Sequence, residues 1–324
     1  MRIKTNSTQV LYFTLSAYFD TGLFKHLYFM ITLCLYMCTV FSNVLLIVVI
    51  CVNRSLHEPM YMFLCSLFVN ELYGSTGLFP SLLIQILSDV HTVSAPLCFL
   101  QVYCLYSYGS VEFLILGAMS YDRYLAICYP LQYGTHMTCS KVAVITAVVW
   151  LYSAFIVVVV ISLSASLQLC GSIINKVYCD NYSIVKLACS DTTVNNIYEI
   201  VYVFAVIVSI LILIIYSYMR ILRVCFSGSK QTRQKAVSTC TPHLTSLINF
   251  SFGAFFEVVQ SRFDMSTVPN MLRIFLSLYW LACPSLFNPV LYGLKMSKIR
   301  GFLLKGCRIF TGCHVLSNKC VDVQ

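Results

Sequence analysis

The strongest constraint on this chain is a series of apolar stretches, each long enough to cross a lipid bilayer as a helix. They cover roughly 27–52, 60–87, 98–124, 142–166, 197–222, 236–260 and 270–293. A helix of about 20 apolar residues spans the ~30 Å hydrocarbon core, and a helix that is apolar all round is a buried or membrane helix. The sequence therefore predicts an all-α membrane protein, a bundle of seven transmembrane helices.

Composition and charge support a membrane protein with little soluble mass. Charged residues make up 10% of the chain, against about 25% in soluble domains. The net charge of +9 is explained by bases gathered in one set of loops if the N-terminus is extracellular. No basic stripe with interleaved aromatics favours nucleic acid. We expect an extracellular N-terminus over 1–26, the bundle over 27–293 and a cytoplasmic tail over 294–324, in the plasma membrane.

Both ends carry features of a membrane protein. The sequon at Asn6 falls on the predicted outer side and is expected to be glycosylated. The tail "LKMSKIRGFLLKGCRIF" alternates bases with apolar residues, which predicts a short amphipathic helix on the anionic inner leaflet. Cys307 and Cys313 are candidates for palmitoylation there, or they stay free thiols. No cleavable leader is evident, and the first apolar stretch is expected to act as the insertion signal.

Several polar residues stand out because they interrupt apolar stretches. Asp122 and Arg123 lie at the end of the third stretch, where an ion pair that opens would bias a two-state equilibrium; the alternative is a plain helix-end pair. Glu71 and Glu112 lie inside apolar helices, which is costly unless they are paired, protonated or hydrated. With Asn43, Asn288 and Ser285, we expect one polar cluster around water or a sodium ion, or two protonated carboxyls bonded to neighbours.

The end of the seventh stretch, "PSLFNPVLYG", predicts a bendable helix. Pro289 removes a backbone hydrogen bond, and Asn288 can bond the freed group. Tyr292 lies one turn further in. A kink without a function is the alternative.

Four cysteines fall on the predicted outer side. Cys98 begins the third stretch, and Cys170, Cys179 and Cys189 follow the fourth. Thiols outside the cell favour disulfides, and four cysteines allow three connectivities.

Together these motifs resemble the rhodopsin-like G-protein-coupled receptors, and further stretches narrow the resemblance to odorant receptors. The stretches are "LHEPMYMFL" at 56–64, "MSYDRYLAICYPLQY" at 119–133, "LACSDT" at 187–192, "SYMRIL" at 217–222 and "KAVSTCTPHL" at 235–244. "NELYGSTGLFP" and "FEVVQSRF" are similar to fish-type receptors. The resemblance covers roughly residues 24–305.

The resemblance implies odorant binding coupled to a stimulatory, olfactory-type G protein that raises cyclic AMP. It makes Arg123 the contact to the G protein, with Asp122 as its inactive-state restraint and Tyr124 beside it. Tyr218 and Tyr292 would be active-state partners. It also assigns a Cys98–Cys179 disulfide, which leaves Cys170–Cys189. No cofactor is implied, and no metal is assigned firmly.

The sequence departs from the family pattern at the polar core and at helix six. Glu71 replaces the usual Asp, and Ser42–Asn43 stands for "GN", which weakens the case for sodium binding. Helix six reads "FSFG", with Ser251 where the family carries an aromatic.

By family analogy, the ligand lies among the outer halves of helices three, five, six and seven. The candidate lining residues are Leu105, Tyr106, Gly109, Ser110, Tyr202, Phe204, Ser251, Phe255, Val258 and Val259, with helix packing as the alternative role. Such a site suits a small, mostly apolar molecule with one or two polar groups. Leu105 stands where amine receptors keep an Asp, which disfavours a simple cationic amine. Glu257 and Arg262 are candidates to bind a polar ligand, or else form a loop salt bridge with Asp264 or Arg273.

Other classes fit the sequence less well. An enzyme lacks support because no nucleophile motif accompanies the carboxyls. A secondary transporter would show an internal repeat and broken helices in corresponding halves. A non-olfactory receptor of the same superfamily, for a lipid or a peptide, is the nearest alternative, and "LHEPMY" and "KAVSTCTPH" argue against it.

Overall fold

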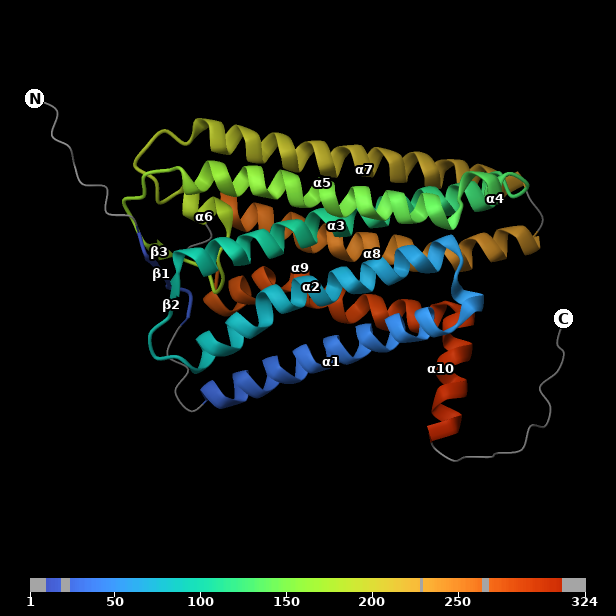
Figure 1. Ribbon diagram of the computed structural model, residues 1–324, viewed down its shortest axis with the longest axis horizontal. Coiled ribbons are helices and arrows are strands. Elements are labelled where there is room, and N and C mark those ends of the chain that lie inside the picture. The colour runs from blue at the N-terminus through green and yellow to red at the C-terminus, as the bar shows by residue number, and fades with distance from the viewer. Residues whose placement is uncertain (1–9, 19–23, 228–229, 264–267, 311–324) are drawn as a thin grey trace, which may run out of the picture.

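A computed structural model describes residues 10–18, 24–227, 230–263 and 268–310, which are mostly helical. Its long helices are α1 (Lys25–Val52), α2 (Pro59–Leu87), α3 (Ala95–Cys128), α5 (Cys139–Ala165), α7 (Thr193–Ser227), α8 (Lys230–Arg262) and α9 (Asn270–Lys295). The shorter ones are the 3-10 turn η2 (Arg54–Leu56), α4 (Tyr133–His136), α6 (Asn181–Val185) and α10 (Ser297–Phe310). Within the described residues the long helices form one bundle, and α10 runs across its end (Figure 1). The predicted seven-helix fold is confirmed.

Each long helix contains one of the predicted apolar stretches, but several helices extend beyond it. The helix α3 continues to Cys128, past Asp122 and Arg123. A helix needs its backbone hydrogen bonds, not apolar side chains, so it runs on where hydropathy ends. Local signals mark the starts: Pro59 opens α2, and the Thr138 hydroxyl accepts from the backbone N–H of Lys141 at 3.3 Å to cap α5.

The helices differ in how much lipid and how much protein they contact. In the apolar window of α3, 67% of the residues are buried, against 22% for α1 and for α5. The helix α3 therefore lies at the centre, packed against α2, α5, α7 and α8. Outer faces of α1 and α5 expose large apolar side chains such as Phe41 and Leu151. The chain is a multi-pass membrane protein, and these faces meet the lipid.

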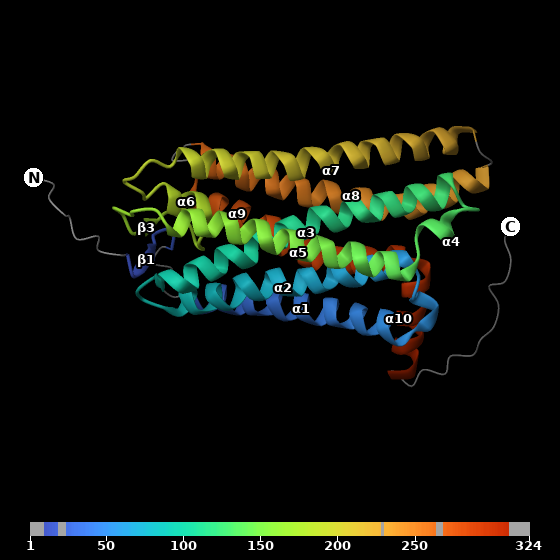
Figure 2. The same cartoon turned by 45° about the horizontal axis from the view of Figure 1, so that its top comes forward.

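Two long helices are less apolar than the others. By length and composition, α1, α3, α5, α7 and α9 qualify as spans within the described residues, while α2 and α8 do not. These two contain the second and sixth predicted stretches, with Glu71 and Glu257 inside them. Both helices still lie within the bundle (Figure 2).

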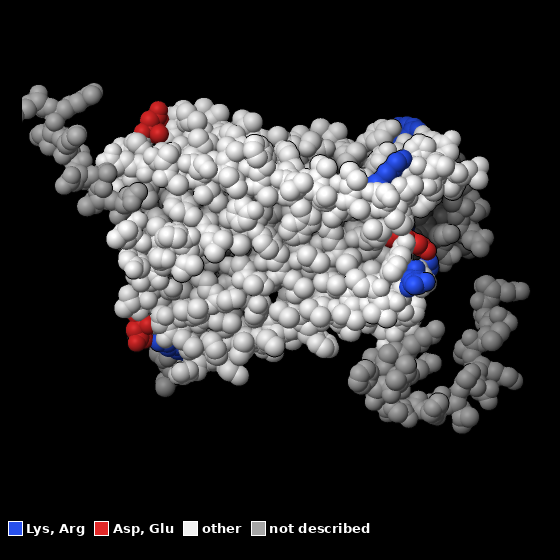
Figure 3. Space-filling model, in the orientation of Figure 1, with Lys and Arg blue, Asp and Glu red and all other residues white. Residues whose placement is uncertain are grey.

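Charged side chains gather at the two ends of the bundle. On the face drawn in Figure 3, Lys, Arg, Asp and Glu lie at the ends and a broad band between them carries none. This distribution fits a protein whose middle lies in hydrocarbon, where an ionised side chain is costly.

A small sheet covers the end of the bundle where the N-terminus lies, and the sequence did not predict it. The strands β1 (Tyr12–Leu15), β2 (Thr92–Ser94) and β3 (Ile173–Ile174) lie in the order β2-β1-β3. The central strand pairs antiparallel with β2 and parallel with β3. Phe13 and Leu15 point inward and are buried. Strands of two to four residues are too short to show an alternating pattern in the sequence.

The helices α8 and α9 approach closely at Gly253. A Cβ atom there would lie 2.6 Å from the backbone Cα of Trp280 and 2.9 Å from its Cβ. Real Cβ atoms do not approach backbone so closely, so glycine lets the two helices pack in contact.

We predict that Gly253→Ala destabilises the bundle, because the methyl group would force α8 away from Trp280. Overpacking of this kind costs about 1–3 kcal/mol. Thermal unfolding of the purified protein in detergent measures the effect. Gly301→Ala in α10 is the matched control, since nothing lies within 4 Å of its added Cβ. Equal melting temperatures for the two variants would contradict the prediction.

Candidate functional site

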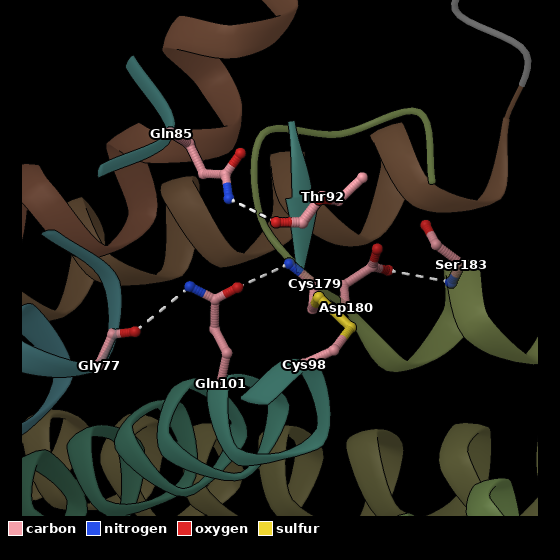
Figure 4. The surroundings of a disulfide bond; sticks show 8 residues. All are labelled: Gly77, Gln85, Thr92, Cys98, Gln101, Cys179, Asp180 and Ser183. Atoms are coloured by element: carbon pink, nitrogen blue, oxygen red, sulfur yellow. Dashed lines mark hydrogen bonds between the residues drawn. A yellow bond between two sulfur atoms is a disulfide. The ribbon is translucent and has the colours of Figure 1, made fainter. Parts of the chain in front are cut away.

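Two disulfides hold the long loop between α5 and α7 over the end of the bundle. Cys98 pairs with Cys179 (Cα–Cα 5.4 Å), and Cys170 pairs with Cys189 (Cα–Cα 5.5 Å). Gln101 adds to the first, because its side-chain oxygen accepts from the Cys179 N–H at 2.9 Å while its amide nitrogen donates to the Gly77 carbonyl at 3.3 Å (Figure 4). The loop is thus fastened to both α3 and α2.

Beneath this loop lies a cavity of about 430 Å³ between α3, α7, α8 and α9. Its lining includes Leu105, Tyr106, Gly109, Ser110, Phe113, Tyr178, Asp180, Tyr182, Glu199, Tyr202, Phe204, Ala254, Glu257, Val258, Ser261, Arg262 and Trp280. Most of these side chains are apolar or aromatic, with a few charged groups near the loop. The shape and lining are those of a small-molecule site.

Seven of the ten predicted lining residues are present, and three are not. Ser251, Phe255 and Val259 are absent from the cavity wall. The α8 residues that do line it follow one helix face, at positions 254, 257, 258, 261 and 262. Phe255 lies off this face and is 64% exposed. Ser251 lies on the same face one turn deeper, below the cavity.

A buried lysine of the loop pairs with two carboxylates at the upper wall of the cavity. Lys176 lies 2.5 Å from Glu257 Oε1, 3.4 Å from Asp180 Oδ2 and 2.8 Å from the Ser261 hydroxyl oxygen. Burial alone would lower the pKa of Lys176, but the carboxylates of Asp180 and Glu257 outweigh it and raise the pKa. The Tyr178 hydroxyl donates to the same Glu257 oxygen at 2.6 Å. Glu257 therefore joins α8 to the loop.

A second ion pair joins α8 to α7. The Arg262 guanidinium lies 3.3 Å from Glu199 Oε2 and 4.0 Å from the centre of the Tyr182 ring. The Tyr106 hydroxyl donates to the other Glu199 oxygen at 2.9 Å. From the sequence, a loop salt bridge of Glu257 or Arg262 with Asp264 or Arg273 is the alternative. In the structure Glu257 pairs with Lys176 and Arg262 pairs with Glu199. Asp264 lies outside the described residues.

Sequence reasoning missed Lys176, Asp180 and Glu199 as members of the site. Glu199 carried a usable signal, since it is an acid inside the fifth apolar stretch, as Glu71 is in the second. Lys176 and Asp180 lie in a polar loop, where charged residues are common and do not indicate a site. Their role depends on how the disulfides fold that loop down.

The floor of the cavity is a cluster of aromatic rings. Trp280 and Phe113 line the cavity, and both meet rings beneath it. The Tyr108 ring lies 5.6 Å from Trp280 and 6.0 Å from Phe250, and Phe250 lies 4.8 Å from Phe113. The Trp280 indole N–H donates to the Tyr178 hydroxyl at 3.2 Å. An aromatic of α9 therefore forms part of the cavity floor.

Below the rings, Glu71, Glu112 and Asn288 meet in one buried cluster. The Asn288 amide donates to Glu71 at 2.6 Å and to Glu112 at 3.1 Å. Asn70 donates to the second Glu112 oxygen at 3.0 Å, and the Tyr108 hydroxyl to the second Glu71 oxygen at 3.1 Å. All four carboxyl oxygens thus have protein donors. The arrangement matches hydrogen-bonded carboxyls better than a sodium cage.

Asn43 and Ser285 link α1 to α9 beside this cluster. The Asn43 amide donates to the Ser285 carbonyl at 2.8 Å and to the Thr39 carbonyl at 2.9 Å. The Ser285 hydroxyl donates to the Leu281 carbonyl at 2.7 Å. These bonds tie α1 to α9 near the bend that contains Pro289.

The opposite end of the bundle carries the predicted coupling residues. Arg123 pairs with the buried Asp122, whose other oxygen accepts from the Tyr133 hydroxyl at 2.7 Å. The Tyr218 hydroxyl donates to the Cys240 carbonyl at 3.5 Å. The Tyr292 hydroxyl lies 3.2 Å from His243 Nδ1, so both predicted active-state partners have other hydrogen-bond partners in this structure. Tyr124 packs edge-on against the Tyr129 ring.

The fold identifies the class of protein. Squid rhodopsin superimposes on it with a TM-score of 0.71, covering 93% of this chain and 86% of that chain at 15% sequence identity. At this identity the likeness establishes the fold, a rhodopsin-like bundle of seven helices.

Sequence relatives narrow the class to one family. A family model described as olfactory receptor matches residues 32–308. Olfactory receptor 52D1 of Homo sapiens is 35% identical over 283 residues, covering 86% of this chain and 89% of the relative. Olfactory receptor 1M1 of Mus musculus is 33% identical, covering 86% of this chain and 88% of the relative. The chain belongs to the olfactory receptor family, whose members are receptors and not enzymes.

We predict that Lys176→Met destabilises the receptor strongly, because it leaves Asp180 and Glu257 buried without their shared cation. Removing one partner of a buried ion pair costs about 3–5 kcal/mol. The melting temperature of the purified protein measures the loss. Lys186→Met is the control, because Lys186 is exposed in the same loop and stacks over Tyr182 at 5.1 Å. A Lys176 variant as stable as the control would contradict the prediction.

Proposed function

We propose that this chain is an odorant-activated receptor that signals through a stimulatory, olfactory-type G protein to raise cyclic AMP. The cavity beneath the loop takes the odorant, and the opposite end of the bundle meets the G protein. The observation that carries the proposal is the closed Asp122–Arg123 pair at that end. It is a polar restraint on the very residue that the family resemblance assigns to the G protein.

The proposed mechanism is a shift between two populations of the receptor. In this structure Arg123 is mostly buried and is held by Asp122. A ligand that binds the open form better shifts the equilibrium toward it, by no more than its differential affinity. Opening frees Arg123, with Tyr218 and Tyr292 as its partners in the open form and the Asn288–Pro289 segment as the bend that lets α9 adjust.

The proposed orientation places the N-terminus outside the cell, in the plasma membrane. Both disulfides lie at the end of the bundle where the N-terminus lies, and disulfides persist in oxidising compartments. The opposite end carries Arg123 and the start of α8, rich in bases, which is the charge bias expected of a cytoplasmic side. Asn6, the proposed glycosylation site, lies outside the described residues.

The helix α10 is proposed to lie on the inner leaflet. It meets the bundle through Ile299, which is fully buried, while Lys298 reaches Glu58 at 2.6 Å. Burial and basic residues on one short helix suit an anionic lipid surface. Cys313 lies outside the described residues, and so does the side chain of Cys307, so palmitoylation of either stays a prediction. The similarity to fish-type receptors is also untested by the mammalian relatives.

We predict that Arg123→Ala abolishes the ligand-dependent rise in cyclic AMP, because the open bundle loses its contact to the G protein. Cells expressing the full chain are challenged with a mixed odorant panel, and surface level is matched by antibody labelling. Arg54→Ala is the control, a base at the same end of the bundle that forms no ion pair within the described residues. Signalling that survives in the Arg123 variant would remove this role.

We predict that Tyr133→Phe raises ligand-independent cyclic AMP. Burial and the Asp122 carboxylate raise the pKa of Tyr133, so its hydroxyl stays protonated and donates to Asp122. A hydrogen bond to a charged group contributes about 1.5–3 kcal/mol, so its loss favours the open form by about tenfold to 150-fold. Tyr121→Phe is the control, since its hydroxyl makes no hydrogen bond in the described part of the chain. An unchanged basal level would show that Tyr133 does not restrain the closed form.

A further inference from the structure

Five charged side chains surround the upper part of the odorant cavity, and their charges do not balance. Asp180, Glu199 and Glu257 line the cavity and carry three negative charges when ionised. Arg262 lines it as well, and Lys176 lies behind the wall. The ionised set therefore has one more negative charge than positive charges, in a place that is largely shielded from water.

The N–H donors of Lys176 are already used by protein oxygens, so none is available to a ligand. An ammonium group has three donors, and three oxygens already lie within reach of Lys176: those of Glu257, Asp180 and Ser261. The Ser261 hydroxyl in turn donates to the Glu257 carbonyl at 2.8 Å. An anionic ligand could therefore bind Lys176 only by displacing one of these three oxygens.

The arginine is also engaged. The Arg262 guanidinium is paired with Glu199 and covers the Tyr182 ring. A ligand carboxylate at Arg262 would compete with Glu199 for the guanidinium. Glu199 is 4% exposed, so its buried charge would then lose part of its ion pair.

The carboxylates, in contrast, have unused acceptors. Among the described residues, Asp180 Oδ1 and Glu257 Oε2 are buried and have no hydrogen-bond partner, whereas the other oxygen of each is bonded to Lys176. Asp180 as a whole is 4% exposed. One lysine nitrogen holds both carboxylates, and both residues line the cavity. A buried acceptor without a donor is costly, and a ligand that supplies donors would satisfy both.

We propose that this cavity takes an organic ammonium ion, a primary amine on a small apolar skeleton, whose N–H groups donate to Asp180 and Glu257. The proposal rests on the proposed function only in treating the cavity as the ligand site. The apolar skeleton lies against the lower wall, formed by Leu105, Val258 and Trp280.

This assignment reverses an expectation drawn from the sequence. Leu105, where amine receptors keep an Asp, disfavoured a cationic amine. The structure supplies the acids from other elements, Asp180 from the loop and Glu257 from α8. An apolar residue at position 105 then becomes part of the wall that holds the skeleton.

The test is thermal stabilisation of the purified full chain in detergent at pH 7, which needs no G protein. The probes are hexylamine, cyclohexylamine and 2-phenylethylamine, each beside the alcohol and the carboxylic acid of the same skeleton. A ligand that binds the folded form raises the melting temperature with concentration. We expect at least one amine to reach half-maximal stabilisation at a concentration about tenfold or more below that of its alcohol and its acid, as charge-assisted bonds imply.

Two variants locate the effect. Asp180→Asn and Glu257→Gln keep the shape of each side chain and remove its charge, and each is expected to lose the preference for the amine over the alcohol. Asp191→Asn is the control, an exposed acid on the same loop. Its preference should match that of the unmodified chain.

The outcomes separate the proposals. If no amine surpasses its alcohol, or if an acid surpasses its amine, the ligand class is overturned, and this comparison uses the unmodified chain, so it holds even if a variant fails to fold. If the preference survives in both variants, the assignment to Asp180 and Glu257 is overturned. If amines stabilise the receptor but cells show no cyclic AMP response, the ligand class stands and the proposed G-protein coupling fails.

Discussion

A bundle in hydrocarbon has no water to satisfy its polar side chains, and this constraint determines most of the internal contacts of the receptor. The clearest case is the Asn288 amide. Both its N–H groups donate, to Glu71 of α2 and Glu112 of α3, and its oxygen accepts from the Ser246 hydroxyl of α8 at 2.7 Å. One amide of α9 thus links three other helices. Buried bonds of this kind favour one packing, because a shift of any of these helices leaves a buried polar group without its partner.

The same constraint acts at the outer cavity, with a different result. There the charges of α7, α8 and the loop are paired as Arg262–Glu199 and Lys176–Glu257, but two carboxylate oxygens are left over. In the central cluster all four carboxyl oxygens have protein donors, which suits a part of the molecule that holds the helices together. The outer set is incomplete, which suits a part that binds something from outside.

The sequence predicts the helices well because length and apolarity are local properties. It also indicates Glu71 and Glu112 as special, since an acid in an apolar stretch is conspicuous wherever it lies. What it does not reveal is the pairing between distant residues. Lys176 and Glu257 are 81 positions apart in sequence, and no local sequence pattern around either residue indicates that they pair. The three short strands are missed for a related reason, because each is defined by partners in another segment and not by its own pattern.

These contacts connect the outer cavity to the inner half of the bundle without a gap. Glu257 accepts from Tyr178, and Tyr178 accepts from Trp280, whose ring packs on Tyr108. The Tyr108 hydroxyl donates to Glu71, which shares the Asn288 amide with Glu112. The helix α8 takes part at three depths, through Glu257, through Ser246 and through His243 beside Tyr292. A ligand that gives Glu257 a new partner therefore changes the contacts of a helix that also touches the central cluster and the inner end. Proximity alone does not transmit a signal, but a ligand that binds one arrangement of α8 better than another shifts the population of all three contacts together.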